Sequence, residues 1–232
     1  MNQNNRKLVA IVFTDIVGFS KLSSEDQTKA SELLKKQREL FQPLVKQFNG
    51  DWIKEIGDGL LIIFNTATEA VKCCIELQKV SNGISGLNIR IGIHLGEVLI
   101  ENGDVIGDDV NIASRIEPFS APGGIAISNK IFDAINREKG YKTKYVGRPK
   151  LKGVSQKVEI FCITSHDLPE TNISDISAKL EILEKTPFKW NFFSLTGAAL
   201  TLVGFLFWKN LSFLGVGIAS ENNIPSISIL IP

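Results

Sequence analysis

The pattern of apolar and polar residues predicts alternating strands and helices over the first part of the chain. Residues 8–13 form a branched apolar run that stops just before Asp15, as at the end of a buried strand. Apolar residues recur at helical spacing from residue 30 to 48. Two further short segments, 52–56 and 60–64, flank a Gly-Asp-Gly turn, which predicts a hairpin.

The remaining pattern completes one α+β domain. Residues 66–80 have helical spacing, residues 88–100 alternate as in a long strand, and residues 107–116 form a short helical stretch. The opening order of strand, helix, hairpin, helix and strand is typical of split β-α-β units. We therefore expect a ferredoxin-like (palm-type) antiparallel sheet with helices on one face. Further short elements are expected at 125–128, 131–137, 143–146 and 158–163.

Two carboxylates fall at turns that this order would bring together. Asp15 ends the first strand, and Asp58 lies at the tip of the hairpin. Neighbouring carboxylates repel, and a cation between them relieves the repulsion. Mg²⁺ suits such a site, because it takes few carboxylates together with phosphate oxygens. The spacing alone also allows Asp15 to be a helix cap and Asp58 a turn residue.

Composition narrows the class of protein. The 232 residues include 26 basic and 25 acidic ones, a formal net charge of +1, which argues against a nucleic-acid partner. Cys73, Cys74 and Cys162 lack the spacing of a zinc or redox site. Mean hydropathy is +0.09, and residues 190–232 contain only two charges, Lys209 and Glu221. The chain therefore joins a charged domain to an apolar tail.

Five motifs give the domain a family resemblance. In chain order they are FTDIVGFS, KEIGDG, RIGIHLGEV, GDVIGDDVNIASRIE and LKG. Together they resemble the catalytic domain of the class III adenylate and guanylate cyclases, over roughly residues 7 to 164. The resemblance implies that Asp15 and Asp58, with the backbone of Ile16, bind two Mg²⁺ or Mn²⁺ ions in each active site.

The resemblance also implies how the purine is selected. Lys54 and Asp104 match the positions that contact the base. A lysine donor and an aspartate acceptor complement adenine, whereas guanine asks for the reverse arrangement. Relatives that use GTP are expected to have an acidic residue at the position of Lys54 and a small polar residue or Cys at that of Asp104. The pair therefore favours ATP. Without the motifs, Lys54 would be a surface strand residue and Asp104 a turn residue.

Three further residues match catalytic or phosphate-binding positions of the family. Asn111 orients the ribose and Arg115 stabilises the α-phosphate in relatives, and their spacing of four places them on one helical face. Lys152 matches a lysine that holds the terminal phosphates. Alternatively, Arg115 forms a structural salt bridge and Lys152 ends a strand. The sequence departs from some relatives at Gly124, where they have an arginine, and His94 is expected to be a packed strand residue.

The resemblance implies a homodimer, because the aspartates and the base-selecting lysine of one site come from opposite chains in the family. The expected activity is adenylate cyclase, which converts ATP to 3′,5′-cyclic AMP and pyrophosphate. A guanylate cyclase is the alternative within the family. A catalytically silent dimerisation or nucleotide-sensing module is the alternative outside enzymes.

The apolar tail predicts one transmembrane helix. Residues 190–208 are uncharged and would extend about 28 Å as a helix, against a hydrocarbon core of about 30 Å. Trp190 and Trp208, followed outward by Lys189 and Lys209, suit the two interfaces. We therefore expect a single-pass protein of the cell (inner) membrane with a cytoplasmic catalytic domain. The expected segments are the catalytic domain 1–166, a linker 167–188 with a short coiled coil, the helix 189–209, and the start of an extracytoplasmic region, 210–232.

Overall fold

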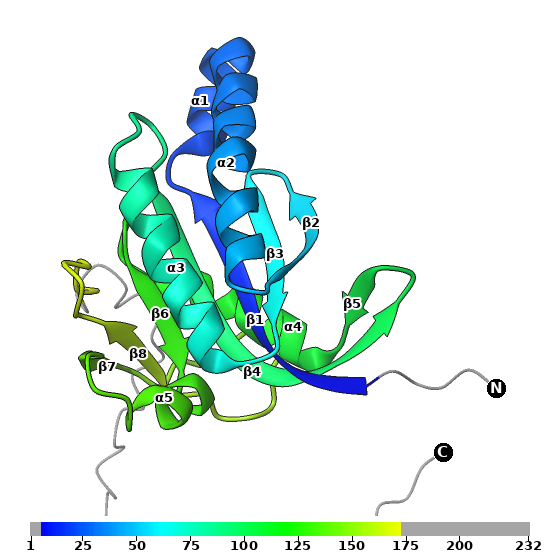
Figure 1. Cartoon of the computed structure of the whole chain (residues 1–232), viewed down its shortest axis with the longest axis vertical. Helices are drawn as coiled ribbons and strands as arrows, with labels where there is room; N and C mark the ends of the chain where they lie inside the picture. Colours follow the sequence, from blue (N-terminus) through cyan, green and yellow to red (C-terminus); the bar gives the residue numbers. More distant parts are fainter. Residues whose placement is uncertain (1–5, 173–232) are drawn as a thin grey trace, which may run out of the picture. The chain divides into compact units, whose positions relative to one another are not determined.

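The structure is a computed structural model that describes residues 6–172 (Figure 1). Its central feature is one eight-stranded sheet with the order β2-β3-β1-β4-β6-β8-β7, in which β5 pairs with β4 alone. The strands are β1 (Arg6–Ile16), β2 (Asp51–Ile56), β3 (Gly59–Phe64), β4 (Ile89–Glu101), β5 (Asp104–Ile106), β6 (Ile125–Ser128), β7 (Thr143–Gly147) and β8 (Ile160–Ile163). The helices are α1 (Phe19–Glu25), α2 (Gln27–Gln47), α3 (Ala67–Asn82), α4 (Asp108–Ile116), α5 (Asn129–Ile135) and the 3-10 turn η1 (Glu117–Phe119).

The sheet is mixed, which corrects the expectation of an antiparallel one. Strand β1 pairs antiparallel with β3 and β4, with Ile11 opposite Ile63 on one side and opposite His94 on the other. Strands β4 and β6 run parallel, with Ile91 opposite Ile125. A parallel pair needs a crossover connection, and the segment between these strands supplies it through β5 and α4. The sequence pattern shows each element but not this crossover.

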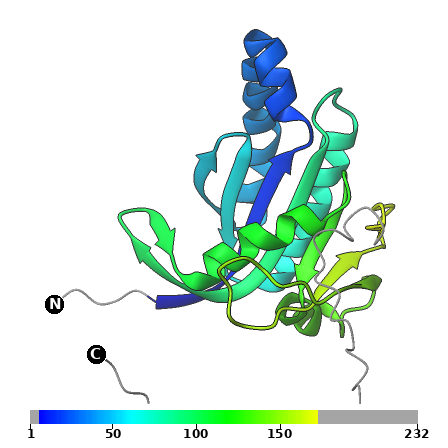
Figure 2. The same ribbon diagram turned by 180° about the vertical axis from the view of Figure 1, so that it is seen from behind.

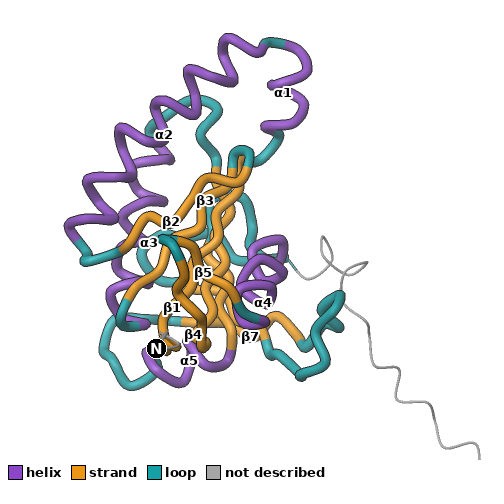
Figure 3. The backbone as a smooth tube through the Cα atoms, turned by 90° about the vertical axis from the view of Figure 1, so that its right-hand side faces the viewer, coloured by secondary structure: helices purple, strands orange, loops and turns teal. Residues whose placement is uncertain are grey.

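Helices cover both faces of the sheet, which corrects the expectation of helices on one face. Figure 3 shows α2 and α3 on one side of the strands and α4 on the other. In Figure 2, the view from behind, α4 lies in front of the sheet and crosses its strands. In β1, Ala10 and Val12 belong to the core cluster under α2 and α3, whereas Val9 and Ile11 belong to the cluster that includes Ala113 of α4. Because β1 is apolar on both faces, each face needs a cover.

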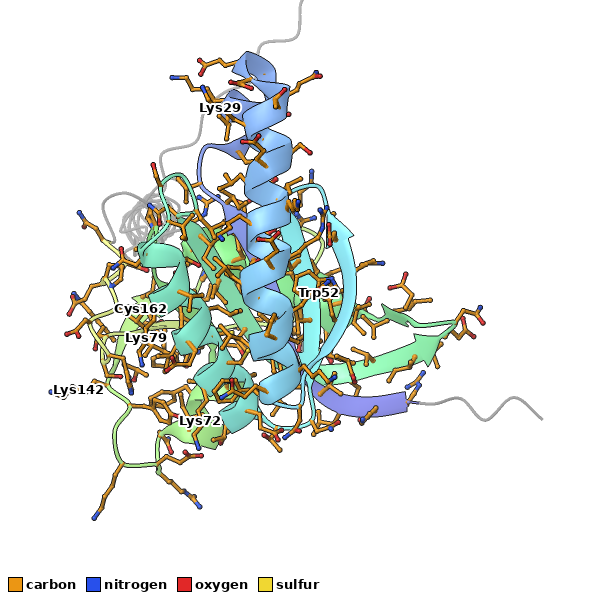
Figure 4. The ribbon with its side chains drawn as sticks, turned by 45° about the horizontal axis from the view of Figure 1, so that its top comes forward. Lys29, Trp52, Lys72, Lys79, Lys142 and Cys162 are labelled. Atoms are coloured by element: carbon orange, nitrogen blue, oxygen red, sulfur yellow. The ribbon has the colours of Figure 1, made fainter. Side chains whose placement is uncertain are left out.

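The long helix α2 shows how the first face is closed. Its buried residues recur along one side and include Phe41 and Val45. Trp52 of β2 packs against the same cluster, and Figure 4 shows it beside α2. This layer holds the β2-β3 hairpin, and therefore Asp58 at its tip, against β1.

The end of the described segment is tied to the domain. Leu168 belongs to the main core cluster, and the Thr171 hydroxyl donates to the Phe119 carbonyl at 2.9 Å. The same hydroxyl accepts a hydrogen bond from the Ala121 N–H at 3.2 Å. These contacts lie beyond residue 166, where the sequence pattern placed the domain end.

The predicted membrane anchor falls on residues that the structure does not describe. The linker from residue 173 onward, the helix at 189–209 and the region 210–232 lie outside the described residues. Within residues 6–172, no helix has both the length and the apolar character that crossing a membrane requires. The anchor stays a prediction.

Candidate active site

The structure brings Asp15 and Asp58 together at the end of β1. The Ile16 N–H donates to the Asp58 carboxylate at 2.9 Å, and the Leu60 N–H donates to the Thr14 hydroxyl at 3.2 Å. The hairpin approaches β1 so closely that a Cβ on Gly59 would lie 2.6 Å from the Thr14 carbonyl oxygen. The short turn and its glycine thus place one carboxylate beside the other.

The electrostatics of this pair favour a bound cation. Burial raises the pKa of Asp58, and the negative charge of Asp15 raises it further, although the hydrogen bond from the Ile16 N–H acts in the opposite direction. Within residues 6–172 there is no cluster of three or more His, Cys, Asp or Glu side chains arranged to hold a metal. Two carboxylates and a backbone carbonyl fit Mg²⁺, which fills its other positions with water and substrate phosphate oxygens.

Arg90 is a residue of this cluster that the sequence analysis missed. It lies on β4 directly opposite Asp15, and its Nη2 is 2.5 Å from the Asp15 Oδ2. Its Nε is 2.8 Å from the Glu117 Oε1, an ion pair at the C-terminal end of α4. Burial alone would lower the pKa of Arg90, but the charges of Glu117 and Asp15 raise it. The charge of Arg90 near the start of a largely apolar strand is the signal that could have pointed to it.

The predicted base-selecting residues also meet. The Lys54 Nζ lies 2.7 Å from the Asp104 Oδ2, and the two side chains are 41% and 45% exposed. They come from β2 and from the start of β5. The hydrogen bond from Lys54 lowers the pKa of Asp104, and the Val105 N–H adds to that effect. The pair is a charged donor and acceptor open to solvent.

The other three predicted residues come from elements other than those that carry the aspartates. Asn111 and Arg115 are exposed on α4, and Lys152 is exposed in the turn after β7. Within the described part of the chain, none of their side chains contacts Asp15 or Asp58 through a hydrogen bond or ion pair. Within the described chain the candidate residues thus fall into two sets that no hydrogen bond or ion pair joins.

We expect Asp58→Asn to stabilise the metal-free protein at pH 7. The raised pKa means that the folded state favours the protonated carboxyl, so ionisation of Asp58 lowers the free energy of unfolding. Asparagine removes the charge and keeps an acceptor for the Ile16 N–H. The gain should be present above the raised pKa and should vanish as pH falls below the ordinary range of an aspartic acid. Thermal unfolding across pH measures it.

The same pair of proteins tests metal binding without an activity assay. Added Mg²⁺ should raise the unfolding temperature of the wild type, because an ion that binds only the folded state stabilises it. The Asp58→Asn protein should respond much less. An equal response of both proteins would contradict a metal site at Asp58.

Comparison with known proteins gives a consistent family. The family model described as the adenylate and guanylate cyclase catalytic domain matches residues 1–165. A Rhizobium meliloti protein named "Putative adenylate cyclase 3" is 32% identical over 170 residues, which are 70% of this chain and 29% of that protein. A receptor-type guanylate cyclase of Caenorhabditis elegans is 29% identical over 167 residues, 62% of this chain and 13% of that protein. The chain thus spans less than a third of the length of either relative.

Solved structures give the same result. An adenylate/guanylate cyclase/hydrolase from Silicibacter pomeroyi has a TM-score of 0.64 at 30% identity, over 72% of this chain and 99% of that one. The adenylyl cyclase CyaB from P. aeruginosa has a TM-score of 0.61 at 26% identity, over 69% of this chain and 95% of that one. Class III cyclases generally use divalent metal ions, which agrees with the paired carboxylates. Residues 1–165 of this chain belong to the family of adenylate and guanylate cyclase catalytic domains.

Proposed function

We propose that this nucleotide cyclase domain is an adenylate cyclase. In the reaction the ribose 3′-oxygen forms a bond to the α-phosphorus of ATP, and the bond to the bridging oxygen of the leaving pyrophosphate breaks. The 3′-hydroxyl proton passes to solvent, and the products are 3′,5′-cyclic AMP and pyrophosphate. The observation that carries the choice of ATP is the exposed Lys54–Asp104 pair, with 2.7 Å between Nζ and Oδ2.

The chemistry of the pair fits adenine. The Watson–Crick edge of adenine has a ring-nitrogen acceptor and an amino donor, which match a lysine donor and a carboxylate acceptor. Guanine has an N–H donor and a carbonyl acceptor at the same places, so both contacts would be mismatched. A site whose polar groups are left unpaired rejects the wrong ligand strongly. The lowered pKa of Asp104 keeps it an acceptor at neutral pH.

The proposal gives the other residues their roles. Asp15, Asp58 and the Ile16 carbonyl would hold two Mg²⁺ or Mn²⁺ ions, which supply charge neutralisation at the phosphates and favour loss of the 3′-hydroxyl proton when bound. Asn111 orients the ribose. Arg115 stabilises the charge that develops on the α-phosphate, a role suited to a permanently charged guanidinium.

The terminal phosphates need further cations. Lys152 is exposed and placed in a turn, where it can reach a phosphate. Arg90 already contacts the Asp15 carboxylate, so it lies beside the place where a phosphate would meet the metal ions. We therefore assign Arg90 to the same phosphate-binding set.

The proposal includes a homodimer with two shared sites. Its support is that Asn111, Arg115 and Lys152 are exposed and that, within residues 6–172, no hydrogen bond or ion pair joins them to the aspartates. A twofold dimer would pair the aspartates of each chain with the second set of the other.

We also propose that residues 189–209 anchor the protein in the cell membrane with the domain on the cytoplasmic side. Recovery of the full chain in the soluble fraction after cell lysis would contradict that anchor.

An assay of the purified protein tests the function directly. The protein is incubated with ATP or GTP and with Mg²⁺ or Mn²⁺, and the cyclic nucleotides are measured. We expect cyclic AMP from ATP and little cyclic GTP from GTP, with no product from the Asp58→Ala protein. Guanylate cyclase relatives make GTP the alternative substrate, and a preference for GTP would favour it. No cyclic product under any of these conditions would favour the catalytically silent module.

A further inference from the structure

Helix α4 lies directly on the backbone of β4. Gly92, His94 and Gly96 alternate along the strand and share the face that α4 covers. A Cβ on Gly96 would lie 2.2 Å from the Asp109 Cβ, and a Cβ on Gly92 would lie 2.3 Å from the Glu117 backbone nitrogen. The two glycines therefore allow close packing at the start of the helix and just beyond its end.

The first turn of α4 is also hydrogen-bonded to β4 through one carboxylate. The His94 Nε2 lies 3.0 Å from the Asp109 Oδ1, and the Glu97 N–H donates to the Asp109 Oδ2 at 2.8 Å. Both oxygens of Asp109 are thus bound by successive parts of the same strand. The Lys130 Nζ lies 3.6 Å from the Asp109 Oδ1 and adds a weaker attraction.

The protonation states suit this contact. The His94 side chain is 1% exposed, and burial lowers its pKa, although the hydrogen bond to Asp109 opposes the change. Burial alone would raise the pKa of Asp109, but His94, the Glu97 N–H and Lys130 lower it overall. The His94 Nδ1 has no hydrogen-bond partner among residues 6–172. A neutral ring that carries its proton on Nε2 satisfies this arrangement.

We propose that His94 and Asp109 are positioning residues that fix α4 on β4 and thereby place Asn111 and Arg115 for the reaction. The inference rests on the proposed catalytic roles of those two residues. Asn111 and Arg115 follow Asp109 by two and six residues on the same nine-residue helix. A shift of the first turn therefore moves both.

The sensitivity of catalysis to geometry gives the expected size of the effect. A displacement of about 1 Å in a group that acts on the reacting atoms costs on the order of 100-fold in rate. A histidine that only fills the core would change stability and leave the turnover of the folded protein intact. Turnover and stability measured on the same variants separate the two roles.

The first test compares His94→Leu with His94→Gln. Leucine fills the space but cannot donate, whereas the glutamine amide can donate from about the position of Nε2. We expect His94→Leu to lower kcat by at least about 10-fold, with KM for ATP within about 2-fold. His94→Gln should stay within about 3-fold of the wild type in both parameters. Equal losses in the two variants, or a change in KM alone, would overturn the proposal.

The second test moves the helix from the strand side. Gly96→Ala should push the Asp109 side chain outward, because the added methyl group would overlap it, and kcat should fall as in His94→Leu. Gly83→Ala is the matched control, since the nearest atom to its Cβ is 3.9 Å away and its φ is −81°. Wild-type turnover in the Gly96→Ala protein, or an equal loss in Gly83→Ala, would overturn the proposal.

Hydrogen exchange separates this inference from the proposed function. In the His94→Leu protein, amide exchange should rise in residues 108–116 and stay unchanged in residues 67–82 of α3. This measurement needs no cyclase activity. An inactive wild type would contradict the proposed function, whereas unchanged amide exchange in α4 of the His94→Leu protein would contradict the positioning role of His94. Asp109→Asn, which keeps the size and loses one acceptor, serves if the leucine variant does not fold, and the same rise in α4 exchange is expected.

Discussion

An equimolar mixture of Asp15→Ala and Arg115→Ala proteins is expected to recover about a quarter of the wild-type cyclase activity. Each variant alone should be inactive, with a loss on the order of 1,000-fold or more, as for a guanidinium that stabilises a phosphoryl transition state. Random pairing makes half of the dimers mixed. In each mixed dimer, one site combines the intact aspartates of the Arg115→Ala chain with the intact arginine of the Asp15→Ala chain and is active. The other site carries both substitutions and is inactive.

The control mixture uses two variants from the same half of the site. Asp15→Ala mixed with Asp58→Ala should recover nothing, because every site then lacks one aspartate. Recovery in both mixtures would contradict the supply of both aspartates by one chain, and no recovery in the first would contradict the shared-site dimer. Cyclic AMP formation after co-incubation measures all three mixtures, including wild type with wild type.

The double variant Lys54→Glu with Asp104→Cys is expected to change the substrate preference from ATP to GTP. The change removes the donor and acceptor that complement adenine and supplies an acceptor for the guanine N–H. We expect kcat/KM for ATP to fall by at least about 100-fold, because buried polar groups of the base would face mismatched partners. Competition between ATP and GTP, with both cyclic products measured, gives the ratio directly.

A charge change elsewhere is the control for this double variant. Lys79 also forms an exposed ion pair, 2.6 Å from Glu76 on α3. Lys79→Glu should leave both kcat/KM values within about 2-fold of the wild type, since exposed pairs contribute little. A double variant that still prefers ATP would show that base selection lies in other residues.

Local sequence patterns predicted most of the elements and the meeting of two carboxylates. The apolar run of β1 and the Gly-Asp-Gly turn are short-range signals that place Asp15 and Asp58 at the ends of their elements, and the meeting of the two carboxylates was expected only if the sheet pairs those elements. The meeting of Lys54 with Asp104 came from the family motifs. In the structure both meetings depend on long-range pairing, since Ile16 bonds Asp58 and Lys54 bonds Asp104 across more than 40 residues of sequence.

The features that the sequence did not reveal depend on contacts between distant segments. The parallel pairing of β4 with β6 depends on α4, which lies in the connection between the two strands. The sequence of α4 does not indicate which face of the sheet the helix covers. Arg90 joins the site only because the β1-β4 register places it opposite Asp15. His94 was expected to be a packed strand residue, which the burial confirms, but its contact with Asp109 depends on the approach of α4.

The hydrogen bonds of Thr171 determine where a shortened catalytic fragment can end. A fragment cut after residue 166 would lose the hydroxyl that bonds both the Phe119 carbonyl and the Ala121 N–H, and it would lose Leu168 from the core. Phe119 ends the turn that follows α4, so this cut would loosen the support of the helix that holds Arg115. Fusion proteins and crystallisation fragments of this domain should therefore retain the chain through Asn172.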